Sequence, residues 1–408
     1  MITAVSGGLQ ASSPNLREDR LMTIPLDRPI RVMRIIARMN VGGPAVQVTG
    51  LMRGFNPIEF DQRLYAGFCE ANEADYLELV AKDLPVIRIR SLGRRVNILG
   101  DIRALLSIVM EIRSFKPDII HTHTAKAGVL GRLASLISMH SSLRVHTFHG
   151  HLLYGYFGFL KLEMIIFLEK LLSKFTHQSL AVGQKVRQDL LDAGIGSEEK
   201  FRVMSPGLSI GPLPSKSKSL DFFEIGGHDI ICGFIGRVTK IKRPDRFLQV
   251  VSELKRRGAK IQFFMAGDGD MLESCRDIIQ KEELAVSVLG WQGEIEKLLS
   301  VADMVILTSD NEGTPLSLIQ AGMAGLPVVS TNVGSVPEVV LQNVTGLITS
   351  QDVQEIANAV EKLAESAEFR AKLGNRAREF TLSHFGVDRL VHEHQELYKN
   401  LISNRAKS

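Results

Sequence analysis

The stretch MVILTSDNEGTPLSLIQAG, residues 304–322, decides which fold to expect from this chain. A short apolar run is followed by a polar turn and then by an apolar segment that starts at Pro315. This order is typical of a β-strand that leads directly into a helix, because the missing N–H of proline costs nothing in the first helical turn. A helix start offers unpaired backbone N–H groups and the positive end of the helix dipole. The stretch therefore predicts a strand–helix junction that suits an anion.

Glu312 is the residue of this turn that a simple anion site does not explain. A carboxylate beside a phosphate-attracting helix end makes sense when the ligand carries hydroxyl groups next to its phosphates, because a carboxylate accepts hydrogen bonds from hydroxyls. A nucleotide sugar is such a ligand. Taken alone, the stretch also fits an ordinary α/β loop.

Length and composition set the class of protein. The 408 residues exceed the usual single core and predict two domains, and 45% hydrophobic with 23% charged residues describes a soluble globular chain. A net charge of +4 is too mild to imply nucleic acid as a partner. The three cysteines are widely spaced and form no CxxC, which argues against disulfides and metal sites and favours a reducing compartment. We therefore expect a cytoplasmic protein, with peripheral attachment to the inner face of the membrane as an open option.

Short apolar strands alternate with helical runs along most of the chain, which is typical of βαβ units and parallel sheets. Strands are expected at 31–39, 86–90, 118–122, 143–147, 179–182 and 201–204, then at 229–235, 261–266, 286–289, 303–308 and 328–330. The pattern predicts an α/β protein with two Rossmann-like, doubly wound domains facing across a cleft. The expected parts are a loose extension (1–28), a first domain (29–208), a Pro/Ser/Lys linker (209–228), a second domain (229–385) and a C-terminal helix packing back on the first domain (386–408).

A basic turn follows the first strand of the second domain. Gly236 and Arg237 come directly after that strand, and Lys242 lies five residues beyond Arg237. Arginine can bind two phosphate oxygens at once, while lysine acts as a mobile point charge. The pair is suited to neutralising a diphosphate leaving group, although a solvated basic turn explains the same residues.

The first domain offers a glycine turn and a group of histidines. Gly42 and Gly43 allow a ligand to approach the backbone closely. The histidines follow two strands, at His121, His123, His146, His149 and His151. No cysteine or carboxylate accompanies them at a ligating spacing, so core or loop histidines are expected in place of zinc ligands. His149, followed by a glycine, is best placed to point into the cleft.

The segment Asp268-Gly269-Asp270 has the form of a DxD metal motif, but it follows a strand and opens a helix. Asp270 is therefore interpreted as a first-turn carboxylate on the helix dipole. Gly267 and Gly269 lack the third glycine of a dinucleotide fingerprint. Neither a metal site nor a dinucleotide site is expected here.

Taken together, these residues resemble the family-4 retaining glycosyltransferases (glycosyl transferases group 1), whose fold is the two-domain GT-B architecture. The resemblance runs from about residue 31 to 394, and the order and spacing of its motifs are more specific than any one of them. The motifs are Gly42-Gly43, His121-Thr122-His123 with Ala127-Gly128, the segment 146–151, Gly236-Arg237 with Lys242, the segment 266–269, the segment 312–315, and Gly334 with Pro337-Glu338.

The resemblance implies transfer of a sugar from a nucleotide diphosphate donor to a hydroxyl acceptor with retention of configuration, and without a metal ion or other cofactor. UDP-sugar is expected in preference to GDP-sugar, and the acceptor is expected to be a carbohydrate or a lipid-linked sugar in polysaccharide, lipopolysaccharide or glycolipid assembly. The catalytic residues implied are Glu312, His149, Arg237 and Lys242. The donor-binding residues implied are Gly42, Gly43, Gly236, Gly313, Thr314, Pro315, Leu316 and Gln320.

Gln320 is the one departure from the family pattern, because the second glutamate of the Glu-x7-Glu signature falls there. A carboxylate would accept hydrogen bonds from two ribose hydroxyls, whereas an amide offers one acceptor oxygen and a donor NH₂. We expect a weaker or altered nucleotide site, at a cost of about 1–2 kcal/mol in donor binding.

Three alternatives stay open at the level of sequence. A sugar-nucleotide 2-epimerase shares the architecture and would change the donor sugar without an acceptor. A non-catalytic sugar-nucleotide binder would explain Gln320 as a sign of decay. The apolar face of the segment 156–175 would suit either a membrane surface or packing on the sheet, and packing on the sheet is the interpretation we favour.

Overall fold

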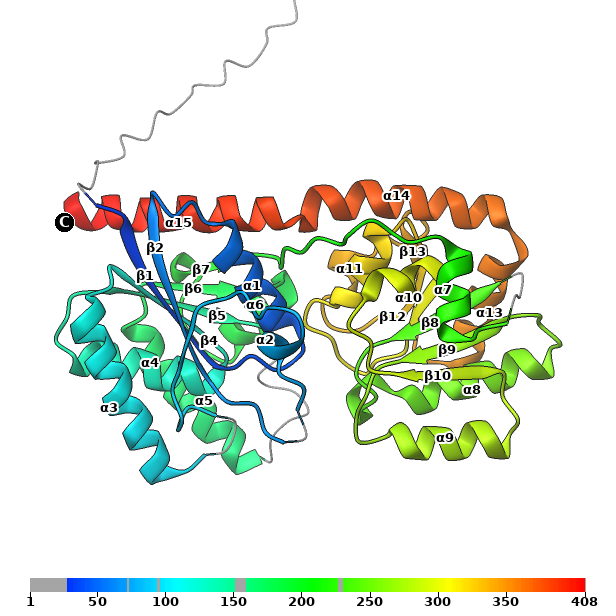
Figure 1. Ribbon diagram of the computed structural model, residues 1–408, viewed down its shortest axis with the longest axis horizontal. Coiled ribbons are helices and arrows are strands. Elements are labelled where there is room, and N and C mark those ends of the chain that lie inside the picture. Colours follow the sequence, from blue (N-terminus) through cyan, green and yellow to red (C-terminus); the bar gives the residue numbers. More distant parts are fainter. Residues whose placement is uncertain (1–27, 72, 94–95, 151–158, 227–229, 408) are drawn as a thin grey trace, which may run out of the picture.

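The computed structural model describes residues 28–407, except 72, 94–95, 151–158 and 227–229. In this part of the chain, strands and helices form two α/β domains side by side (Figure 1). The expected pair of Rossmann-like, doubly wound domains is confirmed. No helix in the described ranges is long and apolar enough to cross a membrane.

The first domain is built on a parallel sheet whose described strands follow the order β3-β2-β1-β4-β5-β6-β7. The central strand β4 is buried along its whole length, because helices cover both faces of the sheet. The strands are β1 (Ile30–Arg38), β2 (Phe60–Gly67), β3 (Val86–Arg88), β4 (Ile119–His123), β5 (Leu143–Phe148), β6 (Gln178–Ala181) and β7 (Phe201–Val203). The helices are α1 (Gly43–Gly54), α2 (Tyr76–Leu79), α3 (Ile98–Phe115), α4 (Ala125–Ile137), α5 (Phe159–Lys174), α6 (Gln184–Asp192) and the 3₁₀ turn η1 (Glu198–Lys200).

The second domain has a parallel sheet with described strands in the order β10-β9-β8-β11-β12-β13. The strands are β8 (Ile231–Ile235), β9 (Gln262–Ala266), β10 (Val286–Gly290), β11 (Met304–Leu307), β12 (Val328–Thr331) and β13 (Gly346–Thr349). The helices are α7 (Lys216–Phe223), η2 (Lys240–Lys242), α8 (Pro244–Arg256), α9 (Leu272–Lys281), α10 (Ile295–Val301), α11 (Leu316–Met323), α12 (Val336–Val339), α13 (Val353–Glu365) and α14 (Ala367–Phe385).

The helices of the first domain form one layer on each face of its sheet. Alternate residues of β1 separate the two layers, since successive side chains of a strand point to opposite faces. Met33 and Ile35 pack with α3 and α4, whereas Ile30 and Val32 pack with α1 and with the C-terminal helix α15 (Val387–Lys407). Helix α5 lies next to α4, to which it is joined by a buried ion pair between Arg132 and Glu169. The layer α3–α4–α5 thus faces away from α15.

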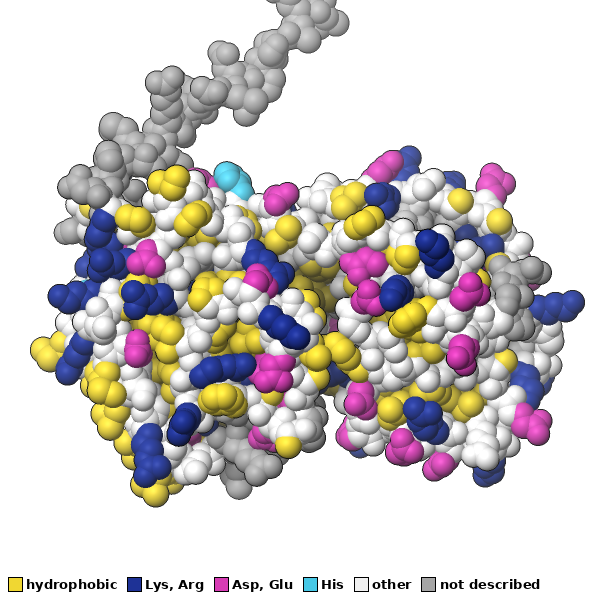
Figure 2. Space-filling model, in the orientation of Figure 1, with side chains coloured by type: hydrophobic (Ala, Val, Ile, Leu, Met, Phe, Trp, Pro, Cys, Tyr) yellow, Lys and Arg dark blue, Asp and Glu magenta, His cyan; other side chains and the backbone are white. Residues whose placement is uncertain are grey.

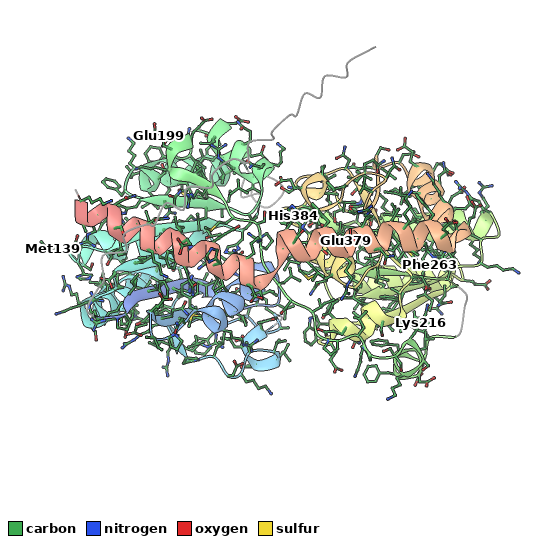
Figure 3. The ribbon with its side chains drawn as sticks, turned by 90° about the horizontal axis from the view of Figure 1, so that it is seen from above. Met139, Glu199, Lys216, Phe263, Glu379 and His384 are labelled. Carbon is green, nitrogen blue, oxygen red and sulfur yellow. The ribbon has the colours of Figure 1, made fainter. Side chains whose placement is uncertain are left out.

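The C-terminal helices α14 and α15 follow one another across both domains (Figure 3). Helix α14 was not expected from the sequence, because it packs on α11 through small side chains and so lacks a strong apolar period. A Cβ atom added at Gly374 would lie 2.0 Å from the carbonyl oxygen of Gly325, and one added at Gly322 would lie 2.5 Å from Cγ2 of Thr381.

Other elements also departed from expectation. Strands β2 and β13 were missed; the first half of β2 is polar and only partly buried. The segment expected as a linker contains helix α7, which is held to the second domain by the ion pair of Lys216 with Asp303 at 2.7 Å. Helix α9 begins at Leu272 with Glu273 as its first-turn acid, so Asp270 precedes the helix and the interpretation of Asp270 as a first-turn carboxylate is wrong.

The strand orders place the expected site residues near one another. Each order reverses direction at one point, between β1 and β4 in the first sheet and between β8 and β11 in the second. In doubly wound folds, ligands bind outside the carboxyl ends of the strands at this point. The Gly42-Gly43 turn follows β1, His123 ends β4, Arg237 follows β8 and Glu312 follows β11.

Candidate active site

Glu312 is held in place in the turn between β11 and α11. Its side chain is only 7% exposed, and its Oε1 atom accepts hydrogen bonds from Ser309 Oγ and from Lys242 Nζ, each at 2.5 Å. Ser309 is itself fixed, because Thr331 Oγ1 donates to its carbonyl oxygen at 2.7 Å. The paired cation and the hydroxyl donor hold this carboxylate in one orientation at low exposure.

The backbone of Glu312 is fixed by the turn that follows β12. Ser335 N donates to the carbonyl oxygen of Glu312 at 3.2 Å. Gly334 lies in the left-handed region with φ of 52°, and a Cβ atom there would fall 1.8 Å from the same oxygen. Only glycine allows this approach, which explains the Gly334 of the family motif.

The basic turn after β8 is bound to the turn that carries Glu312. Asp310 N donates to the carbonyl oxygen of Ile241 at 2.9 Å, and Thr308 Oγ1 donates to that of Arg243 at 2.9 Å. Arg246 completes the connection by donating to Asp310 Oδ1 at 2.7 Å and, through Nη1, to the carbonyl oxygen of Thr308 at 2.6 Å. These bonds hold the two turns in register and so place Lys242 beside Glu312.

Arg237 and Gly236 differ in how far the fold already uses their hydrogen-bonding groups. Arg237 is exposed and forms no ion pair within the described residues, so its guanidinium is available to a ligand. Gly236 uses its N–H on the carbonyl oxygen of Ala266 at 3.0 Å, and the space beside its Cα is open. Its backbone N–H is therefore occupied by the fold, so Gly236 would have to contact a donor through other atoms.

The glycines of the 267–269 segment serve packing. A Cβ atom at Gly267 would lie 1.8 Å from the carbonyl oxygen of Gly236, and one at Gly269 would lie 2.2 Å from that of Val238. Val238 N also donates to the carbonyl oxygen of Asp268 at 2.9 Å. The segment therefore braces the turn that carries Arg237.

Three segments of the first domain meet the second domain at the start of α11. Pro315 is the residue before the helix, and Gly313 lies so close to the first domain that a Cβ atom there would be 3.1 Å from Gly150 Cα. Thr314 Oγ1 donates to the carbonyl oxygen of Val182 at 2.8 Å. A Cβ atom at Gly43 would lie 3.6 Å from Leu316 Cδ1, so the Gly42-Gly43 turn also reaches this point.

Glu338 forms a second connection between the domains. Its carboxylate accepts hydrogen bonds from the backbone N–H groups of Gln184, at 2.7 Å, and Lys185, at 3.0 Å, which are the first residues of α6. A carboxylate at a helix N-terminus satisfies free N–H groups and interacts favourably with the helix dipole. A Cβ atom at Gly183 would lie 2.6 Å from Ser335 Oγ, so glycine is needed there for this fit.

His149 lies at the domain junction and is joined to His123. His123 Nδ1 and His149 Nε2 are 2.9 Å apart, and one ring donates to the other. Burial lowers the pKa of His149 to about 3 and holds the pKa of His123 well below its ordinary value. Both rings are therefore neutral near pH 7, and the proton they share sets the tautomer of each.

Behind this pair lies a buried polar network. His121 contacts the Tyr398 hydroxyl at 2.5 Å through Nδ1 and Thr147 Oγ1 at 2.7 Å through Nε2. Arg34 is fully buried and donates to the same hydroxyl at 2.9 Å. The rings of His121 and His123 are 4.1 Å apart. The network thus connects α15, which supplies Tyr398, to the histidine at the junction.

The expectation for the remaining histidines is confirmed in part. His121, His123 and His146 are buried, as expected of core histidines, but the direct contact of His123 with His149 was not anticipated. The alternation of β4 offered a signal, because residues 121 and 123 share one face of the sheet. His151 lies outside the described residues. Within the described residues, no group of three or more His, Cys, Asp or Glu side chains is arranged to hold a metal ion.

Gln320 is half-buried on α11, eight residues after Glu312. Its side-chain amide forms no hydrogen bond with the described residues, so the fold does not occupy it. Ser309 was missed as a site residue; it lies within the stretch 304–322, but a lone serine there has no distinctive pattern. Glu338 was quoted in a family motif, but no role in the site was predicted for it.

The family model of glycosyl transferases group 1 matches residues 216–380, and that of glycosyltransferase family 4 matches residues 41–210. The capsular polysaccharide biosynthesis glycosyltransferase CapM of Staphylococcus aureus is 22% identical over 81% of this chain and 89% of its own. The UDP-Gal:alpha-D-GlcNAc-diphosphoundecaprenol alpha-1,3-galactosyltransferase of Escherichia coli is 23% identical over 78% of this chain and 84% of its own.

Solved structures share the fold. The Anabaena protein HepE, in complex with UDP and glucose, superposes with a TM-score of 0.77 at 20% identity, over 90% of this chain and 99% of its own. Sucrose-phosphate synthase from Thermosynechococcus elongatus gives a TM-score of 0.79 at 17% identity, over 92% of this chain and 100% of its own. With the two family models matching most of the chain, this protein belongs to the group 1, family-4-type glycosyltransferases of the GT-B fold.

Proposed function

We propose that the protein transfers a hexose from a UDP-sugar to a hydroxyl acceptor with retention of anomeric configuration. The observation that carries the proposal is the contact of Lys242 with Glu312 at the start of α11. In a nucleotide sugar, the phosphate and the sugar hydroxyls flank one bond, so a site for it needs a cation and a carboxylate side by side. The similar HepE structures contain UDP and UDP-glucose, which supports UDP as the nucleotide.

In this proposal, charge develops on the leaving diphosphate, and Arg237 and Lys242 stabilise it together with the backbone N–H groups of Gly313, Thr314 and Leu316. Gly42 and Gly43 let the first domain approach the phosphates, and Glu312 accepts hydrogen bonds from the sugar hydroxyls. The acceptor oxygen bonds to the anomeric carbon on the face from which the diphosphate leaves, and the acceptor proton passes to the departing phosphate oxygen. The bond to the nucleotide breaks, and the configuration is kept. Because these two cations supply the countercharge, we propose that no metal ion is required.

His149 contributes hydrogen bonds, not acid catalysis. A pKa of about 3, caused by burial, leaves the imidazole neutral at physiological pH, so the ring can donate or accept a hydrogen bond at the donor sugar without adding a full charge. His123 holds the ring by its other side.

The acceptor is proposed to be a lipid-linked sugar or a growing polysaccharide. The relatives in capsular polysaccharide biosynthesis and on an undecaprenol-linked acceptor support this class. Such an acceptor places the enzyme on the cytoplasmic side of a membrane, in peripheral contact with it.

The test is to incubate the protein with UDP-sugars, with and without sugar acceptors and with EDTA, and to determine the anomeric configuration of the product. Arg237→Ala should abolish transfer and leave the fold intact, whereas Lys240→Ala, an exposed lysine in the same turn, should retain it. Near-normal turnover by Arg237→Ala would contradict the proposed site. A change in the donor sugar without an acceptor would identify an epimerase, and tight binding without turnover would identify a binding protein.

A further inference from the structure

Large exposed apolar side chains are concentrated on one helical layer of the first domain, α3–α4–α5. We call this the α3–α5 surface. Its members are Ile98, Leu99, Ile102, Leu106 and Met110 on α3, Leu136, Ile137 and Met139 at the end of α4, and Met164, Phe167, Leu171 and Phe175 on and just after α5. Figure 2 shows part of it as hydrophobic side chains along the lower left edge, over α3. A soluble monomer seldom exposes so much apolar surface in one place without a partner.

The two outer helices present the same spacing. Exposed side chains at 99, 102, 106 and 110 on α3, and at 164, 167, 171 and 175 along α5, each follow steps of three, four and four residues, which places them on one side of a helix. The opposite sides of α3 and α5 are buried against the domain. Helix α3 is therefore apolar both toward the core and toward the outside. Helix α5 is apolar toward the outside, and its inner side buries Glu169, in the ion pair with Arg132, beside Leu172. The expectation that the apolar face of the segment 156–175 packs on the sheet is wrong for Met164 and Phe167. Residues 156–158 of that segment lie outside the described part of the chain.

The end of α4 lies between the exposed apolar rows of α3 and α5. Met139 is 91% exposed and lies at the outer end of the first domain (Figure 3). Arg113 of α3 donates to the carbonyl oxygen of Ser138 at 3.4 Å, so the ends of α3 and α4 lie together. Arg144 in turn donates to the carbonyl oxygen of Phe175 at 2.6 Å and to Ser135 Oγ at 3.5 Å, which brings the end of α5 to the same place.

The charges that accompany the surface on α3 are positive. Arg103, Arg113 and Lys116 are exposed along this helix. Its two acidic residues are engaged elsewhere, since Asp101 pairs with Lys126 at 2.6 Å and Glu111 accepts from the Tyr65 hydroxyl at 3.1 Å. Exposed apolar side chains flanked by arginine and lysine suit a surface that is apolar inside and negatively charged outside.

A groove of about 510 Å³ beside α5 also combines apolar side chains with positive charge. Phe167 and Leu171 line it, and three lysines, Lys170, Lys174 and Lys200, stand around them, with no carboxylate among the described lining residues. The groove thus offers apolar contact next to positive charge. The exposed carboxylates of this part of the domain, Glu163, Asp192, Glu198 and Glu199, are not among the lining residues.

We propose that the α3–α5 surface docks the enzyme on an anionic lipid bilayer. The apolar stripes enter the interface between headgroups and acyl chains, and the basic residues contact lipid phosphates. A second copy of the chain is the less suitable occupant, because a two-fold contact would bring the positive α3 helices together without exposed carboxylates on α3 to pair with them. This inference rests on the proposed function in one respect: the bilayer is the place where the enzyme would meet a lipid-linked acceptor.

The experiment is sedimentation of the full chain with vesicles of phosphatidylglycerol and phosphatidylcholine, and with vesicles of phosphatidylcholine alone. The protein should sediment with the anionic vesicles, and less so as salt is raised. Leu106→Glu with Met110→Glu, and separately Phe167→Glu, should each weaken binding at least tenfold. Arg103→Gln with Arg113→Gln should weaken it on anionic vesicles. The matched control is Ile58→Glu with Leu382→Glu, at exposed apolar residues outside the surface, which should bind as the unsubstituted chain.

The proposal is overturned if the chain does not bind anionic vesicles, if the surface variants bind as well as the control, or if the chain is a stable dimer that the surface variants dissociate. Circular dichroism and thermal unfolding show whether each variant is folded. Vesicle binding requires no donor, and transfer to a soluble sugar acceptor requires no vesicle. A failure of this inference is therefore distinguishable from a failure of the proposed transferase activity.

Discussion

The outer helices of the two domains differ in what they expose. Helices α8 and α13 of the second domain bury their apolar side chains against the sheet and expose polar residues such as Gln249, Glu355 and Lys362. Helices α3 and α5 of the first domain expose leucine, methionine and phenylalanine side chains. The residues that the two domains contribute to the candidate active site also differ in charge. The second domain brings charged groups to the junction, Arg237, Lys242 and Glu312, while the first brings neutral buried histidines. In the proposed function, the second domain therefore binds the charged nucleotide, and the first domain provides an apolar exterior and uncharged contacts.

We call Arg237, Lys242 and Glu312 the charged half of the site, and His123 and His149 the neutral half. The largest loss of activity is expected from a substitution in the charged half. Glu312→Gln keeps the shape of the side chain but removes the charge that pairs with Lys242 and that accepts from Ser309. Losing one oriented electrostatic contact to the reacting sugar should lower kcat by about 10²–10³-fold. Steady-state kinetics on the UDP-sugar that the chain turns over measure this.

The matched control is Glu273→Gln, an exposed glutamate on α9 of the same domain. It should retain kcat. If Glu312→Gln kept kcat within a few-fold while its thermal stability was unchanged, the assignment of the charged half would be wrong.

A smaller effect is expected at the neutral half. His123→Ala removes the partner that fixes the tautomer and orientation of His149, and loss of such a supporting contact commonly costs 10–100-fold in activity. The loss should fall on kcat more than on KM for the acceptor, because His123 reaches the donor only through His149. His123→Asn retains a hydrogen-bonding group near the position of Nδ1 and should recover part of the activity.

This comparison also separates a positioning role from a structural one. A purely structural role of His123 would lower thermal stability equally in both variants without the partial recovery by asparagine. Equal activity of the two variants would therefore remove His123 from the site.

The two halves also differ in how far sequence could predict them. Glu312, Arg237 and Lys242 are predictable because each follows a strand in a short motif, and turns of neighbouring parallel strands meet at one edge. The contact between His123 and His149 depends on the distance between β4 and the turn after β5, which no local pattern encodes. The alternation of β4 shows only that His121 and His123 share a face. Likewise, Glu338 acts at α6, some 150 residues away, and only the packing of the two domains brings them together.

The surface of the first domain was the hardest part to predict, for a physical reason. An apolar stripe at helical spacing has the same sequence whether it faces a sheet or a membrane, so periodicity cannot assign the side. On α3 both sides are apolar, and only the fold shows which side is covered. In the second domain, α8 has a single apolar side, and its burial follows from the sequence.

The neutral histidines should make stability depend on pH. Burial lowers the pKa of His149 and of His394 to about 3, and for His394 the nearby Arg34 adds to the effect. An unfolded histidine has a pKa of about 6.5, so between these values the unfolded chain binds protons that the folded chain does not. The free energy of unfolding should therefore fall as the pH is lowered from about 6.5, by up to about 1.4 kcal/mol per pH unit for each such histidine.

Urea unfolding at pH 7, 6 and 5 measures this dependence. His394→Asn should reduce the slope of the free energy of unfolding against pH by an amount that corresponds to at most one proton. The same substitution at the exposed His384 serves as the control. A free energy of unfolding that stays constant from pH 7 to 5 would show that the buried histidines do not stay neutral.

The smallest effect is a gain, and it concerns the nucleotide end of the charged half. Gln320 leaves its amide without a hydrogen bond to the described residues, so Gln320→Glu can add a charged acceptor without breaking a contact of the fold. Two ribose hydroxyls could then donate to one carboxylate, which should tighten UDP-sugar binding by about 1–2 kcal/mol, or roughly 5–30-fold. Isothermal titration with UDP and with the UDP-sugar measures it, and Gln354→Glu, on the exposed face of α13, is the matched control. Unchanged or weaker binding by Gln320→Glu would show that position 320 does not meet the ribose, and that the donor lies differently on α11 from the family pattern.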